Sequence, residues 1–233
     1  MVQDKSSAVA NTECCAIIPA LNEEQRITHI LETALGCGVF SDVLVVDDGS
    51  SDATGVVAQR CGARVVRHEQ NRGKALAMLT GLNHTKAPLV CFLDADLIAV
   101  TPAHLIALVA PVRQEEAKAT LGVFRGGRIA TGLAQWIAPM ISGQRCLSRK
   151  LLVEFNSWDS GYGIETAINS FLLSKGIRQR IVYWHGAAQI MKEEKWGFIR
   201  GTRTRLKMIY EVILAWVKTT IHRIIIRCRK KKC

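Results

Sequence analysis

Two aspartates separated by one residue, Asp94 and Asp96, follow an apolar run at residues 87–93. Such a run is typical of a buried strand in a parallel sheet, which places both carboxylates at its carboxyl end. Two neighbouring negative charges in a buried site are costly unless a cation shares them. Mg²⁺ and Mn²⁺ prefer such oxygen ligands and often share them with substrate phosphates. The pair is therefore a candidate metal–diphosphate site, although an isolated Asp-x-Asp is more often only a turn or a helix cap.

Three polar loops lie in the same half of the chain as this pair, at residues 19–23, 47–50 and 71–74. Each follows a short apolar run that is typical of a strand, directly or after a few residues. In the first loop, Asn22 is expected to cap a helix that reaches about Gly36. Because open α/β sheets bind ligands at the carboxyl ends of their strands, we expect the loops to surround the two aspartates.

Strands and helices are predicted to alternate along most of the chain, as in an α/β protein with a mostly parallel central sheet and flanking helices. The 233 residues suffice for one well-packed domain with an appendage. We therefore expect a flexible lead-in at 1–12, one domain at 13–195 and a basic amphipathic segment at 196–233.

Several later elements of the domain are predicted from periodicity. They are helices near 75–82 and 163–174 and strands at 119–124 and 181–184. An uncharged run at 129–144 is too short, and too rich in Gly, Thr, Gln and Ser, to predict a membrane span.

The composition excludes several classes of protein. The first residues contain no apolar signal core, so a cytoplasmic location is expected. The eight cysteines show neither a CxxC pair nor zinc-ligand spacing, which indicates reduced, mostly buried thiols. Residues 73–75 lack the Walker A pattern, and no GxGxxG follows the first strand, so a kinase or a dehydrogenase is disfavoured. The net charge of +11 is concentrated in the last forty residues rather than spread over the surface, which argues against nucleic-acid binding.

Together, the polar loops and the Asp94/Asp96 pair resemble, in order and spacing, the family 2 inverting glycosyltransferases of the GT-A fold. This family includes the polyprenyl-phosphate sugar synthases. The resemblance is strong over residues 14–105 and looser up to residue 201. It implies a GT-A α/β fold and the transfer of a sugar, with inversion, from a UDP- or GDP-linked donor with the help of Mg²⁺ or Mn²⁺.

The resemblance assigns the nucleotide sugar to the loops at the strand ends. Carboxylates suit this task because the imide N–H of uracil and the ribose hydroxyls are donors, and a lysine suits the phosphates. The residues implied are Pro19, Ala20, Asn22, Glu23, Asp47, Asp48, Lys74, Asp94 and Ala95.

The metal is implied to lie on Asp96 and Asp94, where it would neutralise the diphosphate leaving group. Many enzymes of this fold complete the metal site with a histidine late in the domain. His185 lies near that place in the sequence, and similar proteins carry His where Gln189 stands. The third ligand is therefore left between these two residues.

Inverting transfer needs a general base that deprotonates the acceptor. The segment 158–165 resembles the acceptor side of the family, and Glu165 and Asp159 are the candidate catalytic residues. An equal alternative is that Asp159 caps the following helix and Glu165 forms an ion pair on it.

The acceptor itself is implied to meet basic residues. Ser142 and Arg145 belong to a Ser-Gly-x-Arg stretch like the one that contacts acceptor phosphate in the polyprenyl-phosphate sugar synthases. Arg125 and Arg128, on a glycine-flanked loop, could reach the same anion, although loop arginines are more often simply solvated.

The end of the chain has a different pattern. From Trp196 onward there are eleven Lys or Arg and one acid, Glu211. Residues 198–227 predict an amphipathic helix that is too interrupted by charge to span a bilayer. It fits a helix lying on an anionic membrane surface, with 198–232 as the contact, followed by a polybasic tail. The alternative is that its apolar face packs on the domain or on a second copy in a homodimer.

The sequence therefore predicts an inverting glycosyltransferase at the cytoplasmic membrane face, peripherally bound, with a polyprenyl phosphate or another lipid as acceptor. The alternative acceptor is a soluble phosphorylated molecule such as phosphoglycerate, because 161–165 also resembles soluble relatives that glycosylate it. A non-catalytic nucleotide-sugar binder or membrane adaptor is the alternative of another class.

Overall fold

The computed structural model describes residues 13–125, 142–159 and 163–189. A central sheet has the strand order β3-β2-β1-β4-β7-β6-β8. Its strands are β1 (Cys14–Ala20), β2 (Asp42–Asp47), β3 (Arg64–Arg67), β4 (Leu89–Phe92), β6 (Ala119–Arg125), β7 (Arg145–Ser148) and β8 (Arg180–His185). A small second sheet pairs β5 (Leu97–Ile98) with β9 (Ala188–Gln189).

The central sheet is parallel except for one strand. β1 pairs in parallel with β2 and β4, β2 with β3, and β6 with β8. β7 lies antiparallel to both of its neighbours, β4 and β6. The carboxyl ends of the six other strands therefore share one edge of the sheet, and β7 begins at that edge. This arrangement confirms the expected fold class.

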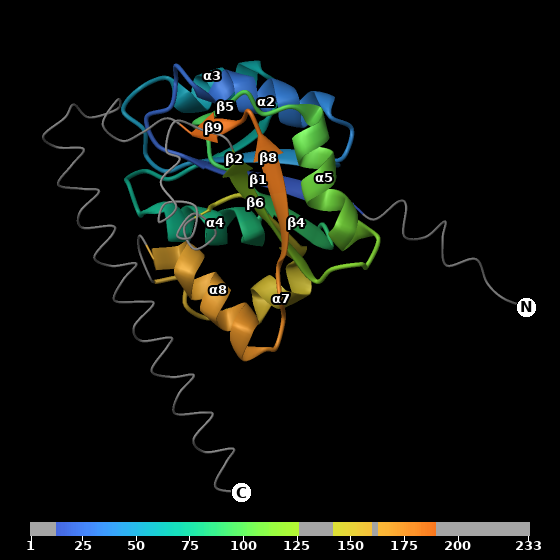
Figure 1. Cartoon of the computed structure of the whole chain (residues 1–233). Helices are drawn as coiled ribbons and strands as arrows, with labels where there is room; N and C mark the ends of the chain where they lie inside the picture. The colour runs from blue at the N-terminus through green and yellow to red at the C-terminus, as the bar shows by residue number, and fades with distance from the viewer. Residues whose placement is uncertain (1–12, 126–141, 160–162, 190–233) are drawn as a thin grey trace, which may run out of the picture.

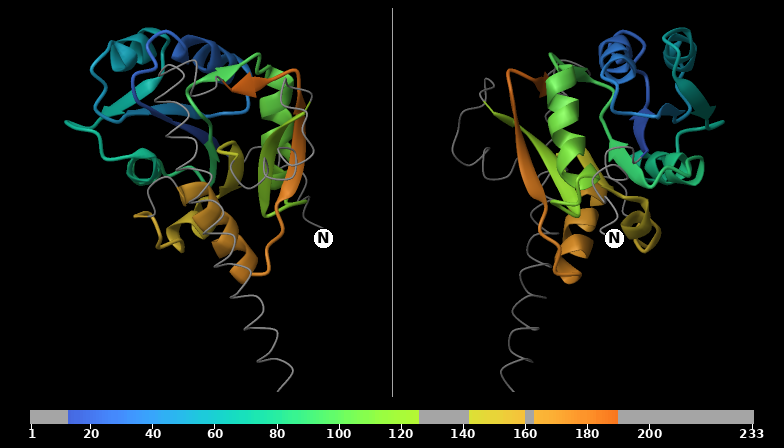
Figure 2. Two further views of the ribbon diagram at one scale, coloured as in Figure 1. Left: turned by 60° about the vertical axis from the view of Figure 1, so that its left-hand side comes forward. Right: turned by 90° about the vertical axis from the view of Figure 1, so that its right-hand side faces the viewer.

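Helices cover both faces of the sheet, as Figures 1 and 2 show. One face carries α2 (Ile27–Gly36), α3 (Thr54–Arg60) and α5 (Pro102–Arg113), and the other carries α4 (Lys74–Asn83), α7 (Arg149–Val153) and α8 (Ile164–Ser174). The buried strand β1 contributes side chains to the apolar layer on each face of the sheet, because successive side chains of a strand point to opposite faces. Ile18 packs with the first layer and Ile17 with the second.

The contact between α4 and β1 positions the first residue of α4, Lys74, at the ligand-binding edge. Gly81 faces β1 so closely that a Cβ at this position would lie 2.4 Å from Cγ2 of Ile17. The missing side chain therefore lets the helix lie directly on the strand. Ala77 and Met78 bury the rest of this helix face in the second apolar layer.

Most of the predicted elements are confirmed, including helices α4 and α8 and strands β6 and β8. The cap predicted at Asn22 is wrong. Helix α2 begins at Ile27, with Arg26 at its N-cap position. Asn22 instead adopts a left-handed backbone with φ 56°, and its side-chain oxygen accepts a hydrogen bond from the Ser51 amide at 2.9 Å. It therefore links the loops after β1 and β2, a long-range contact that local capping rules cannot anticipate.

The helix predicted at 198–227, the polybasic tail and Arg128 lie outside the described residues. Among the described helices, none is long and apolar enough to cross a bilayer.

Candidate active site

Asp94 and Asp96 lie just beyond the carboxyl end of β4. Asp94 is 8% exposed and Asp96 is 6% exposed. Both oxygens of Asp94 bind protein donors. Nζ of Lys74 lies 2.6 Å from Oδ1, and Nε2 of Gln144 donates to Oδ2 at 2.6 Å. Lys74 is the first residue of α4, and Gln144 directly precedes β7. Three separate parts of the chain therefore meet at this carboxylate.

Lys74 also binds the predicted catalytic residue Glu165, with 2.6 Å between Nζ and Oε1. Burial lowers the pKa of the Lys74 ammonium, but the charges and hydrogen bonds of Asp94 and Glu165 outweigh burial and raise this pKa above its usual value. Lys74 therefore remains a cation at neutral pH. It joins the carboxylate of Asp94, just after β4, to the carboxylate of Glu165 at the start of α8.

Arg145, predicted to contact the acceptor, is fully buried behind this cluster. Its guanidinium donates to the Ser142 carbonyl at 2.6 Å and to Oδ1 of Asn169 at 3.2 Å. Burial lowers the pKa of Arg145 to about 10, against the opposing effect of the Glu165 and Asp94 charges. Ser142 is buried as well, and its hydroxyl lies 2.8 Å from Oε1 of Gln144. Arg145 thus binds Ser142, Ser142 binds Gln144, and Gln144 binds Asp94, so both residues help to hold Asp94 in position.

The aspartates after β2 are equally enclosed. Asp47 is fully buried; it accepts a hydrogen bond from the Ser50 amide at 2.9 Å and pairs with Arg67 at 2.9 Å. Asp48 is 3% exposed and binds two backbone amides of the 71–74 loop as well as His68. Asp47 therefore ties its own loop to the end of β3, and Asp48 ties this loop to the one before α4.

The loop after β1 is built on the same edge. Glu23 is buried, and its amide donates to the Thr54 hydroxyl at 2.8 Å. The Ala20 carbonyl accepts from the Asp48 amide at 2.9 Å, which ties the ends of β1 and β2 together. Pro19 belongs to β1, and Ala95 lies buried between the two aspartates that follow β4. The predicted nucleotide-binding loops therefore do gather at one edge of the sheet.

Other predicted site residues are not brought into this cluster. Asp159 and His185 are exposed, His185 at the end of β8. Arg125 is exposed too, with its guanidinium carbon 5.0 Å above the Tyr183 ring. The backbone of Gln189 pairs with Leu97, the residue after Asp96, so β9 runs beside the aspartate pair.

The donor set fits a hard divalent cation that is shared with a substrate. Within the described ranges, no three His, Cys, Asp or Glu side chains are grouped to hold a metal, so His185 does not join Asp94 and Asp96 in one cluster. Two carboxylates are nevertheless the usual protein contribution to a Mg²⁺ site that is completed by water and substrate phosphates. Asp94 and Asp96 therefore suit Mg²⁺ or Mn²⁺ that arrives with a diphosphate.

Sequence reasoning missed Gln144 and His68 as parts of the site. Gln144 stands at the variable position of the Ser-Gly-x-Arg stretch, and its full burial with a bond to Asp94 is visible only in three dimensions. His68 follows the end of β3 and carries no motif. The sequence signal that could have indicated His68 was its position directly after a strand that leads to the 71–74 loop.

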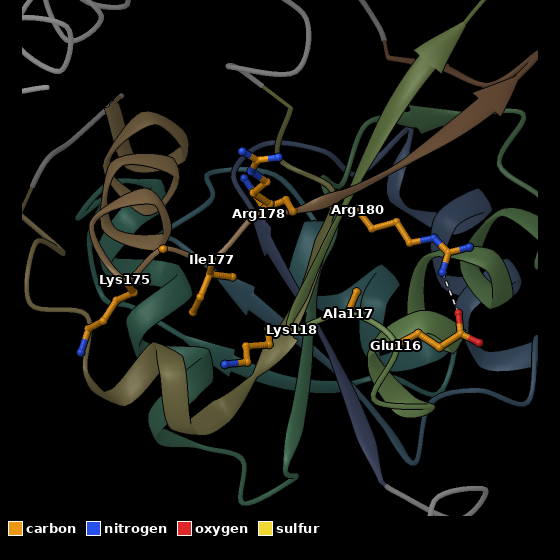
Figure 3. A pocket seen from close by; sticks show the side chains of 9 residues that line it. Glu116, Ala117, Lys118, Lys175, Ile177, Arg178 and Arg180 are labelled. Carbon is orange, nitrogen blue, oxygen red and sulfur yellow. Dashed lines mark hydrogen bonds and ion pairs between the residues drawn. The ribbon is translucent and has the colours of Figure 1, made fainter. Parts of the chain in front are cut away.

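A basic hollow of about 410 Å³ lies at the opposite edge of the sheet, at the amino ends of β6 and β8 (Figure 3). Its cations are Lys118, Lys175, Arg178 and Arg180. They point in different directions in Figure 3, and Arg180 and Lys175 form ion pairs of 2.6 Å with Glu116 and Glu154. The side chains of this hollow therefore do not converge on one point, and the site beside β4 is the better candidate for the active site.

The chain matches the family "Glycosyl transferase family 2" over residues 15–170. This match covers the sheet edge just described and more than half of the chain. The chain therefore belongs to this glycosyltransferase family.

Among curated proteins, the glucosyl-3-phosphoglycerate synthase of Mycobacterium tuberculosis H37Rv is 28% identical over 204 residues, which cover 72% of this chain and 63% of the synthase. The chain thus spans less than two thirds of that relative. The 4,4'-diaponeurosporenoate glycosyltransferase of Staphylococcus aureus MRSA252 is 36% identical over 112 residues, which cover 46% of this chain and 30% of that protein.

Solved structures give the same picture. The M. tuberculosis glucosyl-3-phosphoglycerate synthase in complex with Mn²⁺, UDP and phosphoglyceric acid superimposes with a TM-score of 0.74 at 26% identity. The match covers 91% of this chain and 80% of that one. The same enzyme with Mg²⁺ and UDP gives a TM-score of 0.69 at 26% identity, covering 91% of this chain and 81% of that one.

Proposed function

We propose that this protein is a metal-dependent glycosyltransferase that moves a sugar from a UDP-sugar to a small phosphorylated acceptor such as phosphoglycerate. The observation that carries the proposal is the cluster at the end of β4, where Lys74 joins the donor-side carboxylate Asp94 to the acceptor-side carboxylate Glu165. Support for the acceptor comes from relatives of similar architecture that bind UDP and phosphoglyceric acid. The lipid acceptor that was the first expectation from sequence becomes the second candidate.

The donor half of the site is assigned to Asp94, Asp96 and Lys74. The two aspartates would hold Mn²⁺ or Mg²⁺, which when bound neutralises charge on the diphosphate leaving group. Lys74 is a permanent cation at the start of α4, within reach of the same carboxylate. It is suited to bind the donor phosphates directly, because an ammonium donates to phosphate oxygens as readily as to carboxylates.

The acceptor half is assigned to Glu165. Its Oε1 lies 2.6 Å from Nζ of Lys74, and a carboxylate in this place is suited to accept a proton from an acceptor hydroxyl. Asp159 remains the second candidate base, but it is exposed and lies outside the cluster. Inversion at the sugar carbon stays a prediction, and the anomeric proton coupling of the product in a ¹H NMR spectrum checks it.

The direct test incubates the full chain with UDP-glucose, Mn²⁺ and 3-phosphoglycerate, and measures UDP release together with the mass of the product. We expect a glucosylated phosphoglycerate whose formation stops on adding EDTA. A parallel reaction with a polyprenyl phosphate in detergent tests the second candidate, which the diaponeurosporenoate-glycosylating relative favours. UDP binding without transfer to either acceptor would contradict both and leave a non-catalytic nucleotide-sugar binder.

Membrane association through 198–232 is a separate part of the proposal. Its support is the concentration of positive charge after Trp196. Flotation with vesicles of phosphatidylcholine and phosphatidylglycerol should carry the full chain upward, and a chain lacking 198–233 should stay at the bottom. Equal flotation of the full and the shortened chain would contradict membrane association through 198–232.

A further inference from the structure

A buried histidine lies directly behind the donor half of the site. His68, just after β3, is 8% exposed. Its Nδ1 lies 2.7 Å from Oδ1 of Asp48, and its Nε2 lies 2.9 Å from the hydroxyl of Thr80 on α4. Because a carboxylate only accepts hydrogen bonds, the Nδ1–H must be the donor to Asp48. The imidazole therefore links the end of β2 to the helix that begins with Lys74.

Asp48 passes this link on to the loop in front of α4. Its Oδ1 accepts from the Arg72 amide at 2.9 Å, and its Oδ2 accepts from the Gly73 amide at 2.8 Å. These two amides immediately precede Lys74. Three donors of this chain therefore bind the two oxygens of Asp48, and direct contact of Asp48 with a nucleotide stays a prediction.

The backbone is shaped for this arrangement. Gly73 has φ 92°, a conformation that favours glycine, and it is the N-cap residue of α4. No side chain caps this helix at Gly73. The two bonds that Asp48 accepts thus hold the entry into α4 in place of a conventional cap, together with a bond of 2.9 Å from the Gly73 amide to Oδ1 of Asn71, and they help to set where the Lys74 side chain begins.

We propose that His68 is a positioning residue of the donor site, which through Asp48 fixes the 71–74 loop and so sets the position of Lys74. The proposal rests on the proposed function in so far as Lys74 binds the donor diphosphate. His68 holds the Lys74 ammonium in place before the donor binds. Losing His68 should therefore weaken binding of the donor and leave binding of the acceptor unchanged.

The first test measures the loop without any ligand. His68→Leu removes the donor to Asp48, His68→Asn keeps an N–H at the place of Nδ1, and His84→Leu is the matched control, since His84 is exposed and its ring contacts a main-chain carbonyl of α4. Hydrogen exchange followed by mass spectrometry should show amides 71–74 exchanging about tenfold faster in His68→Leu only. Unchanged exchange in that variant, at an unchanged melting temperature, would overturn the proposal.

The second test asks whether His68 acts through Lys74. Titration calorimetry with UDP and Mn²⁺ should give about tenfold weaker binding for His68→Leu, with affinity restored in His68→Asn. In a Lys74→Met background the His68→Leu change should have no further effect. An undiminished effect in that background would show that His68 acts otherwise, and would overturn the proposal.

The two tests separate this proposal from the proposed function. If the wild-type chain bound no UDP, the function proposed above would fail. Hydrogen exchange would still decide whether His68 and Asp48 fix the loop.

Discussion

At the scale of single residues, the site is a compact set of opposite charges in which Asp94 is the centre. It receives Lys74 on one oxygen and Gln144 on the other, and Arg145 lies buried behind Gln144 and Ser142. Buried charges are tolerated only when paired and hydrogen-bonded, so each member depends on the others. Removing one partner should therefore disturb ligand binding more than its own contacts suggest.

Asp96→Asn tests the metal assignment. The change keeps the size of the side chain and removes a charge that a divalent cation needs, so UDP binding in the presence of Mn²⁺ should weaken at least about tenfold. Titration calorimetry checks this, with Glu116→Gln at the opposite edge of the sheet as the control carboxylate. Wild-type affinity in Asp96→Asn would contradict the assignment.

Gly143→Ala tests the position of Asp94. A Cβ at this residue would lie 2.7 Å from each carboxylate oxygen of Asp94, so the aspartate must shift from the position in which it binds Lys74 and Gln144. We expect weaker UDP binding and a melting temperature lowered by roughly 2–4 °C, the effect of about 1 kcal/mol in a domain of this size. Gly163→Ala is the control, because a Cβ there would meet no atom within 4 Å. Equal effects of the two changes would exclude a specific role for Gly143.

The sequence located part of this site and missed the rest for a physical reason. Asp94 and Asp96 were predictable because an apolar strand must end at the surface, and the ends of parallel strands carry ligand-binding loops. The bond between Lys74 and Glu165 joins residues 91 positions apart and depends on where the fold places the first turns of α4 and α8. No local pattern encodes such a contact, so Glu165 was equally well explained as an ordinary helix residue.

At the scale of elements, the loops at the carboxyl edge are held by contacts between loops and not by caps of their own. Asn22 binds the Ser51 amide, Glu23 is held by Thr54, and Asp48 binds the loop before α4. Periodicity predicted the helices and strands well because burial on the sheet enforces it. It could not predict Asn22, or the short antiparallel strand β7, because these depend on partners far away in the sequence.

Gly49→Ala tests the closeness of two of these loops. A Cβ at residue 49 would lie 2.6 Å from the carbonyl carbon of Gln70, and the residue has φ 76°. Urea unfolding should show a loss of roughly 1–3 kcal/mol. Gly38→Ala separates the two causes, because Gly38 has φ 70° but open space around a Cβ. If both changes destabilise equally, backbone strain alone accounts for the effect and the contact with Gln70 is unimportant.

At the scale of the whole molecule, buried thiols line the sheet that divides the two apolar layers. Cys14, Cys15, Cys91 and Cys146 are each fully buried and reduced. Burial raises the pKa of the Cys15 thiol to about 12 and also raises the pKa of Cys91. This agrees with the expectation of reduced thiols packed in the core.

These thiols predict a loss of stability in alkaline solution. A thiol whose pKa is higher in the folded state stabilises the protein fully below the unfolded pKa of 9.0, and this contribution falls as pH rises toward the folded value. Between about pH 9 and about pH 10 the Cys15 thiol alone should lower the free energy of unfolding by about 1 kcal/mol, and Cys91 acts in the same direction. Urea unfolding at the two pH values checks this. The Cys15→Ala variant should lose less than the wild type, and an equal loss would refute the prediction.

The single reversed strand has a consequence for how this protein could be re-engineered. β6 ends at Arg125 and its antiparallel neighbour β7 begins at Arg145, so these two strand ends lie at the same rim of the sheet. Because both ends are fixed by strand pairing, replacing residues 126–141 by the corresponding residues of another family member should leave the seven-stranded sheet folded. Thermal unfolding of such a chimaera, compared with that of the parent chain, checks this.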